Sequence, residues 1–223
     1  MINKKKAACF IPVKAKSKRV VGKNLRSLND KRLFEWMIDT VVASDIFDEI
    51  FVDTDSSAVA HYCSAFPVTV IEREPELASD SANGNDLLNY WHEKYPNFDY
   101  YFQAFVTSPF TALETIRECV DILKTTTEFD SIFTAYEECG WYWFENKPIN
   151  YDPAVLPRSQ DAKKVFSEST ALYGITASAL KKNSCRIGSA PYHYFVSDME
   201  AIDIDSEFDF MIAEIIAKEY YYA

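Results

Sequence analysis

The sequence is poor in glycine, with five in 223 residues, and it lacks the glycine-rich patterns typical of common nucleotide-binding loops. There is no G-x-x-x-x-G-K, the phosphate-binding loop of many ATPases, and no G-x-G-x-x-G, the dinucleotide fingerprint. The G-x-S-x-G elbow that carries a nucleophilic serine is missing as well. These absences argue against an ATPase, a dehydrogenase and a serine hydrolase.

Cysteines and long apolar runs are also scarce. The five cysteines form no C-x-x-C pair, and their odd number and wide spacing favour reduced thiols over a disulfide framework or a zinc site. The apolar run after the lysines at positions 4–6 has only the length of a strand, which is too short for a signal peptide. No run approaches the roughly 18 residues of a membrane span. We therefore expect a soluble cytoplasmic protein with no membrane partner.

Positive charge is in the minority. The chain carries 23 lysines and arginines against 34 acidic residues, for a net charge of −11 and a sequence pI near 4.8. General nucleic-acid binders need a basic face for the phosphates, so we expect no nucleic-acid partner. The composition, 48% hydrophobic and 26% charged, is that of an ordinary globular protein, and the length fits a single domain over residues 1–223.

Strand and helix patterns alternate along the first two thirds of the chain. Short apolar runs predict strands at 6–12, 49–55, 68–72, 98–106 and 131–136. Helical periodicity predicts helices at 33–44, 56–66, 85–95 and 113–125. This order predicts an α/β fold with a mostly parallel sheet and helices on both faces. The order resumes at residues 171–180, and residues 201–222 predict a strand followed by a C-terminal helix.

The regularity stops between residues 137 and 164. The stretch GWYWFENKPINYDPAVLPRSQDAKK contains three prolines, several aromatic residues and no helical period. We predict a hairpin or arm here that leaves the main sheet. Because the segment is too aromatic to lie in water, we expect it to pack on a partner subunit.

The strongest functional signal is a cationic loop after the first strand. The stretch FIPVKAKSKRVVGKNL places five basic residues within ten positions, namely Lys14, Lys16, Lys18, Arg19 and Lys23. In open α/β folds, nucleotides bind at the carboxyl ends of the parallel strands. A nucleoside triphosphate carries about four negative charges and needs fixed cations and N–H donors. The loop supplies these cations, with Ser17 as a hydroxyl donor and Asn24 for a ribose or base edge, and a solvated basic loop is the alternative.

A second signal is the acidic run Asp203-Ile204-Asp205 near the end of the chain. In a strand, residues i and i+2 face the same side, so the two carboxylates would converge on one point. Two carboxylates with open positions suit Mg²⁺, or Mn²⁺, shared with phosphate oxygens. The alternative is a capping cluster for the final helix, with Asp205 as the N-cap and Glu207 and Asp209 in the first turn.

Smaller features lie at the same predicted sheet edge. Asp53 and Asp55 end the second strand, where they either contact a nucleotide or, as we favour, cap the following helix. The turn that begins at Thr107 ends the central strand that carries Gln103. A serine or glutamine there is suited to recognise a base or a sugar hydroxyl, although turn formation alone accounts for the Ser-Pro pair. The three histidines are isolated and receive no role.

These segments together resemble the acylneuraminate cytidylyltransferases, the family that makes CMP-activated sialic acids and related nonulosonates. The cationic loop is similar to the family's I-P-A-R-x-G-S-K-R-x-x-x-K-N motif, REPELASDSANGND to its R-P-x-x-L-A-x-D-[ST] loop, and VTSPF to its P-T-S-P-L turn. RSQD, FSESTALYG and DIDSEFDF are similar to its R-R-Q-D, Y-x-E-N-G-A-I-Y and D-I-D-x-x-x-D-F motifs. These motifs occur in the family's order and cover nearly the whole chain.

The resemblance implies a Rossmann-like sheet, a homodimer whose protruding arm completes the neighbour's site, and Mg²⁺-dependent transfer of CMP from CTP to an acidic sugar. It implies that Lys14 and Lys23 contact phosphates and contribute to catalysis, and that Asn24 lies near the nucleotide. It makes Asp203 and Asp205 the metal ligands, also with a catalytic role. Two further groups follow from it: Asp80 and Ser81 in the loop that reads cytosine, and Gln103, Arg158, Gln160, Ser169 and Tyr173 at the sugar, with Arg158 on its carboxylate.

The chain departs from the family pattern at several of these positions. Lys14 replaces an arginine and so lacks its bidentate fork, and Ala15 and Lys16 stand where glycines are common. Phe105 aligns with a family glutamine, and Ser169-Thr170 replaces Asn-Gly in the sugar site. The expected acceptor is thus a sialic, pseudaminic, legionaminic or related ulosonic acid. The alternatives are a nucleotidylyltransferase of the same fold that uses Kdo or another sugar, and a catalytically silent nucleotide-binding relative.

Overall fold

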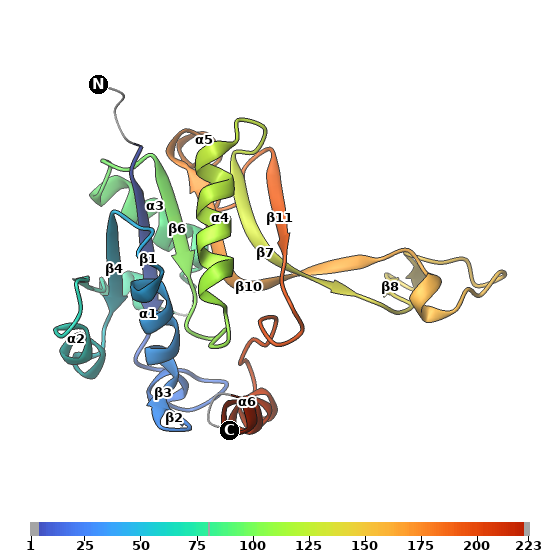
Figure 1. Cartoon of the computed structure of the whole chain (residues 1–223), viewed down its shortest axis with the longest axis horizontal. Coiled ribbons are helices and arrows are strands. Elements are labelled where there is room, and N and C mark those ends of the chain that lie inside the picture. Colours follow the sequence, from blue (N-terminus) through green and yellow to red (C-terminus); the bar gives the residue numbers. More distant parts are fainter. Residues whose placement is uncertain (1–4, 80, 221–223) are drawn as a thin grey trace.

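The computed structural model describes residues 5–79 and 81–220, and its main feature is a sheet of seven strands (Figure 1). The order across the sheet is β11-β7-β10-β6-β1-β4-β5. The strands are β1 (Ala7–Val13), β4 (Glu49–Thr54), β5 (Thr69–Glu72), β6 (Tyr100–Ala104), β7 (Ser131–Glu138), β10 (Val165–Thr176) and β11 (Pro191–Phe195). Strand β10 runs antiparallel to both its neighbours, and every other pairing in the sheet is parallel. The prediction of a mostly parallel α/β sheet is therefore confirmed.

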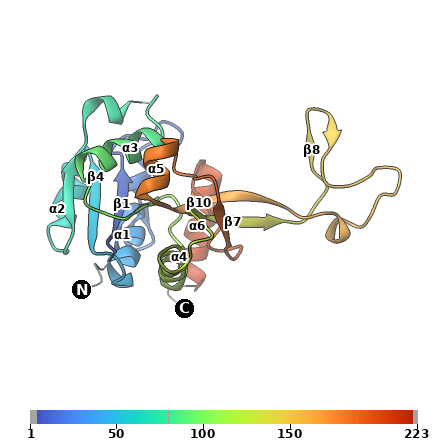
Figure 2. The same ribbon diagram turned by 90° about the horizontal axis from the view of Figure 1, so that it is seen from above.

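Helices cover both faces of this sheet (Figure 2). They are α1 (Leu33–Ser44), α2 (Ser57–Cys63), α3 (Gly84–Lys94), α4 (Leu113–Thr125), α5 (Ala177–Asn183) and α6 (Glu207–Tyr220). Short elements complete the chain: the two-stranded pairs β2 (Ser27–Leu28) with β3 (Lys31–Arg32) and β8 (Trp143–Phe144) with β9 (Lys147–Pro148), and the 3₁₀ turns η1 (Lys23–Leu25), η2 (Pro75–Ala78) and η3 (Ser159–Asp161).

The alternation of side chains along β1 divides the core into two layers. Cys9 and Ile11 point to the face covered by α1 and α4, where they join one apolar cluster. Ala8 and Phe10 point to the face covered by α3 and α5, and Phe10 stacks on Trp91 of α3 with ring centroids 4.8 Å apart. Both faces of β1 are thus fully buried, as expected for a central parallel strand.

Residues 137–164 form an arm that projects away from the sheet (Figure 1). Strands β7 and β10 continue beyond the sheet as a two-stranded ribbon, with Glu138 paired to Val165 at its end. The arm exposes large aromatic side chains, with Trp143 and Phe144 at 56% and 65% of their full exposure.

One sequence prediction about an element was wrong, and two others gave the right element with bounds that were too long. Residues 203–205 are a loop and not a strand, because buried Ile204 is held by a hydrogen bond from its N–H to Thr107 O at 2.9 Å and not by a strand ladder. The expected strand at 98–106 is shorter, at 100–104, and the helix expected at 56–66 covers only 57–63. Strand β11 was missed because its residues are mostly half-buried and form no apolar run.

Two further observations concern composition. All five cysteines are free, and Cys139, on the arm, is the exposed one. Within the part of the chain that the structure describes, no helix combines the length and apolar character needed to cross a membrane.

Candidate active site

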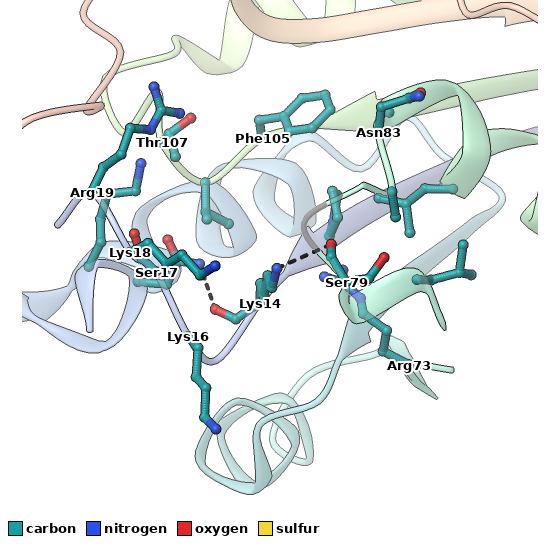
Figure 3. A pocket seen from close by; sticks show the side chains of 18 residues that line it. Lys14, Lys16, Ser17, Lys18, Arg19, Arg73, Ser79, Asn83, Phe105 and Thr107 are labelled. Atoms are coloured by element: carbon teal, nitrogen blue, oxygen red, sulfur yellow. Dashed lines mark hydrogen bonds between the residues drawn. The ribbon is translucent and has the colours of Figure 1, made fainter. Parts of the chain in front are cut away.

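A cavity of about 500 Å³ opens where β1 and β6 end (Figure 3). One side is the cationic loop after β1, and the other sides are formed by the segment around η2, the start of α3 and the residues that follow β6. The lining residues include Lys14, Lys16, Ser17, Lys18, Arg19, Lys23, Asn24, Arg73, Ser79, Asn83, Gly84, Phe105 and Thr107. The structure thus gathers the cations that the sequence singled out around one cavity at the carboxyl edge of the sheet, where α/β folds bind nucleotides.

Hydrogen bonds between side chains and the backbone hold the start of the cationic loop in place. The Asn24 side chain donates to Lys14 O at 2.8 Å, and the backbone N–H of Ala15 donates to Asp55 Oδ1 at 2.6 Å. Lys14 Nζ donates across the cavity to Ser79 O at 3.3 Å. Our preference for Asp55 as a helix cap was therefore wrong, because Asp55 supports the loop and Ser56 caps α2 by accepting from the N–H of Val59.

Lys23 joins the cationic loop to the acidic loop near the end of the chain. Its side chain is buried, donates to Ile204 O, and lies with Nζ 3.5 Å from Asp205 Oδ1. Burial lowers the pKa of Lys23, and the charges of Asp205 and Asp203 oppose that shift. The two segments, about 180 residues apart in the sequence, therefore form one site.

The two aspartates of the acidic loop have different surroundings. Asp205 is half-exposed and forms a two-point ion pair with Arg19, with N–O distances of 2.7 and 2.8 Å. Asp203 has a buried Oδ1 without a hydrogen-bond partner among the described residues. Burial raises the pKa of Asp203, the Thr107 hydroxyl opposes the shift and the neighbouring Asp205 adds to it. A desolvated carboxylate with one partnerless oxygen, beside a second carboxylate, is a place where a cation would be stabilised.

The structure also shows that Asp205 is not the N-cap of helix α6. Ser206 Oγ accepts from the N–H of Asp209 at 3.2 Å, and Asp209 Oδ2 accepts from the N–H of Ser206 at 2.7 Å. This reciprocal pair is a capping box that places the N-cap of α6 at Ser206. Asp203 and Asp205 lie outside it, so helix capping does not account for either carboxylate.

These residues fit a divalent cation of the Mg²⁺ type. Among residues 5–79 and 81–220 there is no group of three or more His, Cys, Asp or Glu side chains arranged to hold a metal. Mg²⁺ is typically bound by one or two carboxylates together with substrate phosphates and water, which matches Asp203 and Asp205 next to the cationic cavity. The ion pair between Arg19 and Asp205 must open before a cation can bind Asp205. Opening this pair costs little free energy because the Arg19 side chain is 71% exposed.

The expected sugar-binding residues of β6 and β10 lie at a bulge in the sheet. The pairing of β10 with β7 shifts between Glu168 and Tyr173, and Thr170 within the bulge has φ of 58°. Tyr173 is buried and donates its hydroxyl to Glu168 Oε2 at 2.5 Å. Opposite it on β6, Gln103 is fully buried and donates from Nε2 to Gly84 O at 2.8 Å.

Buried polar atoms without partners are concentrated at this end of the sheet. Five of the six such side-chain atoms among the described residues belong to expected site residues or their neighbour in the bulge: Asn24 Oδ1, Gln103 Oε1, Ser169 Oγ, Thr170 Oγ1 and Asp203 Oδ1. Leaving a buried polar atom unsatisfied costs about 1–3 kcal/mol, so such a cluster points to a polar ligand that completes it.

A family model described as Cytidylyltransferase matches residues 8–205. The chain belongs to this cytidylyltransferase family. The matched span contains all of the sheet except Ala7, together with the arm, the cationic loop and the acidic loop.

Individual relatives and solved structures agree with this assignment. N-acylneuraminate cytidylyltransferase A of Danio rerio is 26% identical over 215 residues, which cover 93% of this chain and 50% of that protein. Post-translational flagellin modification protein B of Campylobacter coli is 26% identical over 228 residues, which cover 95% and 94%. CMP:2-keto-3-deoxy-manno-octonic acid synthetase, solved with CTP, has the same fold, with a TM-score of 0.70 at 14% identity over 96% of this chain and 99% of that one. The chain spans about half the length of the curated N-acylneuraminate cytidylyltransferases it matches.

Not every expected site residue of this cytidylyltransferase-family chain reaches the cavity. Arg158 and Gln160 lie on the arm and are exposed, and Arg158 pairs with Asp161 at 2.6 Å. They are not brought to the cavity of their own chain. Ser81 is exposed beside Ser79, with their hydroxyl oxygens 3.0 Å apart, and Asp80 lies outside the described residues.

Sequence reasoning gave no role to two arginines of this site. Arg73 lines the cavity and is buried against Asp53, to which its Nε donates at 2.5 Å. Its position in the motif REPELAS was a signal that could have drawn attention to it. Arg186 lies against Gly84 and Tyr173, and it belongs to no motif that the sequence offered.

Proposed function

We propose that this chain transfers CMP from CTP to the anomeric hydroxyl of an acidic ulosonic sugar and releases pyrophosphate. The observation that carries this proposal is that Lys23, which lines the cavity, joins the cationic loop to the loop that carries two carboxylates. Fixed cations on one side and metal-binding carboxylates on the other are what a triphosphate and its cation need. The family assignment supports cytidine as the nucleotide base.

The residues of the cavity have distinct roles in this reaction. Lys14 and Lys23 neutralise the charge that develops on the transferred and leaving phosphates, with Ser17 and Lys18 as further phosphate contacts. Lys23 suits this task because it is held rigid by burial and by its hydrogen bond to Ile204 O. Asp203 and Asp205 would hold Mg²⁺, which when bound supplies Lewis-acid stabilisation of the phosphate and lowers the pKa of the attacking hydroxyl.

In this proposal, the sugar acceptor binds near Gln103 and Tyr173. The partnerless oxygens of Gln103, Ser169 and Thr170 provide hydrogen-bonding capacity for a polyhydroxylated molecule. The Danio rerio relative is named an N-acylneuraminate cytidylyltransferase, and this name supports an acid of the acylneuraminate type as the acceptor.

The assembly in this proposal is a cytoplasmic homodimer. The arm carries Arg158 and Gln160 away from their own cavity and exposes Trp143 and Phe144. A second subunit would cover these aromatic side chains and receive the two polar residues near its sugar site. Sedimentation of the purified chain tests this directly, because a monomer at micromolar concentration would contradict it.

Pyrophosphate release tests the reaction itself. The purified chain is given CTP, Mg²⁺ and, in turn, N-acetylneuraminic, pseudaminic and legionaminic acid and Kdo. We expect release with at least one of the nonulosonic acids and none with ATP in place of CTP. Release with Kdo alone would replace the acceptor class, and binding of CTP without release for any acceptor would favour the silent form.

A further inference from the structure

Arg186 occupies an unusual position for a charged side chain. It follows α5, and its backbone N–H donates to Asn85 Oδ1 at 2.9 Å, which ties it to the first turn of α3. Its guanidinium carbon lies 3.6 Å from the centre of the Tyr173 ring and 5.8 Å from that of Phe105. An arginine stacked in this way is held in one orientation by two aromatic side chains.

Most of the hydrogen-bonding capacity of this guanidinium is unused. A guanidinium has five N–H donors. In the described part of the chain, the side chain of Arg186 makes one recorded hydrogen bond, from Nη2 to Glu168 Oε2 at 3.3 Å, which is long for a charge-assisted contact. Glu168 also accepts the Tyr173 hydroxyl at the shorter distance of 2.5 Å, so its carboxylate is shared.

The guanidinium of Arg186 lies next to Gly84, a residue of the cavity wall. A Cβ added at Gly84 would come within 2.8 Å of Arg186 Nη1 and within 3.6 Å of Gln103 Oε1. Gly84 therefore leaves the space in which the guanidinium lies, and both Gly84 and Phe105 line the cavity. In Figure 3, Phe105 and Asn83 form the side of the cavity across from Lys16. Arg186 Nη1 and the partnerless Gln103 Oε1 both lie near Gly84, so a cation and an unsatisfied acceptor are found at the same part of the cavity wall.

We propose that Arg186 determines acceptor specificity by binding the carboxylate of the acidic sugar from within the same chain. This inference rests on the proposed function. A planar carboxylate matches the arginine fork in a two-point contact, and it would replace the long contact with Glu168. Arg158, to which the resemblance assigns the carboxylate, lies on the exposed arm and is not brought to the cavity of its own chain.

The test compares an acid with its uncharged analogue on two versions of the protein. Calorimetry measures the binding of N-acetylneuraminic, pseudaminic and legionaminic acid, and of the C1 carboxamide of each, to the full chain loaded with CDP. The variants are Arg186→Met, which keeps the stem over Tyr173, and Arg186→Lys, which keeps the charge without the fork. Lys182→Met on the exposed side of α5 is the matched control for net charge.

A charge-assisted hydrogen bond contributes about 1.5–3 kcal/mol, or about 10- to 100-fold in affinity. We therefore expect the wild type to prefer an acid over its carboxamide by about this factor. The preference should fall to within about twofold in Arg186→Met, be partly kept in Arg186→Lys and be unchanged in Lys182→Met. An equal loss of affinity for acid and carboxamide would reduce Arg186 to a structural residue and overturn the proposal.

Two other outcomes also decide the question. An unchanged preference in Arg186→Met, or no binding of any of the acids by the wild type, would overturn the role of Arg186. Pyrophosphate release by the same preparation is measured separately. If pyrophosphate is released but the preference for the acid does not depend on Arg186, only the role of Arg186 is refuted. If the preference depends on Arg186 but no pyrophosphate is released, only the proposed reaction is refuted.

Discussion

The buried pair of Arg73 and Asp53 allows a quantitative test of how the cavity wall is held. The side chains are 3% and 0% exposed, and Arg73 donates from Nε to Asp53 Oδ1 at 2.5 Å and from Nη2 to Asp53 O at 2.9 Å. The other carboxylate oxygen accepts from Trp91 Nε1 at 2.6 Å. Arg73→Met removes the cation but leaves Asp53 charged and buried. Such a loss typically costs about 3–5 kcal/mol.

For a chain of this length, each kcal/mol lowers the melting temperature by about 2–4 °C, so Arg73→Met should melt about 6–20 °C below the wild type. The double variant Asp53→Asn/Arg73→Met is the control, because the amide oxygen still accepts from Trp91 while the buried charge is gone. It should recover most of the loss. Thermal and urea unfolding followed by circular dichroism measure both. A loss below about 1 kcal/mol in the single variant, or no recovery in the double, would refute the reasoning.

The remaining predictions concern the acidic loop and the bulge. Asp203→Asn should lower pyrophosphate release about a hundredfold or more with the fold intact, since one such contact contributes about 2.7–4 kcal/mol to lowering the barrier; unchanged turnover at saturating Mg²⁺ would remove Asp203 from the metal site. Burial raises the pKa of Asp203 above its ordinary value of 3.8. Protonated Asp203 therefore contributes to the stability of the fold below pH 3.8, and this contribution is lost as the pH rises through the folded-state pKa. Without Mg²⁺, urea unfolding at several pH values should therefore show Asp203→Asn gaining on the wild type as pH rises, and a gap independent of pH would contradict this. Thr170→Gly should raise the melting temperature by a few degrees, because a β-branched residue at φ of 58° stores about 1–3 kcal/mol of strain and glycine costs only about 0.5–1 kcal/mol in return; a lower melting temperature would show that the bulge is not strained.

The parts of the fold that could be predicted from sequence are those that depend on local pattern. The continuous apolar run of β1 and the helical periodicity of α1 and α4 report burial directly, and these elements were correctly placed. Strand β11 was missed because an edge strand needs little apolar surface. The loop at Asp203 was taken for a strand because a buried residue between two polar ones has the same alternation in either structure.

The candidate site was predictable where chemistry is clustered in sequence and not where folding alone assembles it. The cations from Lys14 to Lys23 lie within ten positions of the sequence. Their number in so short a loop predicted that they would share one site, and in the structure they line one cavity. The burial of Lys23 and its contact with Ile204 depend on packing between distant segments and left no sequence signal. Arg186 stands alone in the sequence. Its position depends on contacts with Gly84 and Tyr173, and no sequence periodicity connects these three residues.

The central claim is that the sugar hydroxyl attacks the α-phosphorus of CTP in the cavity between the cationic and acidic loops. It is tested most directly with an acceptor labelled with ¹⁸O at the anomeric hydroxyl, followed by mass spectrometry of the products. We predict a CMP-sugar that keeps the label in the bridging oxygen, together with unlabelled pyrophosphate. A CMP-sugar without the label, pyrophosphate that carries it, or no CMP-sugar with any ulosonic acid would contradict the account.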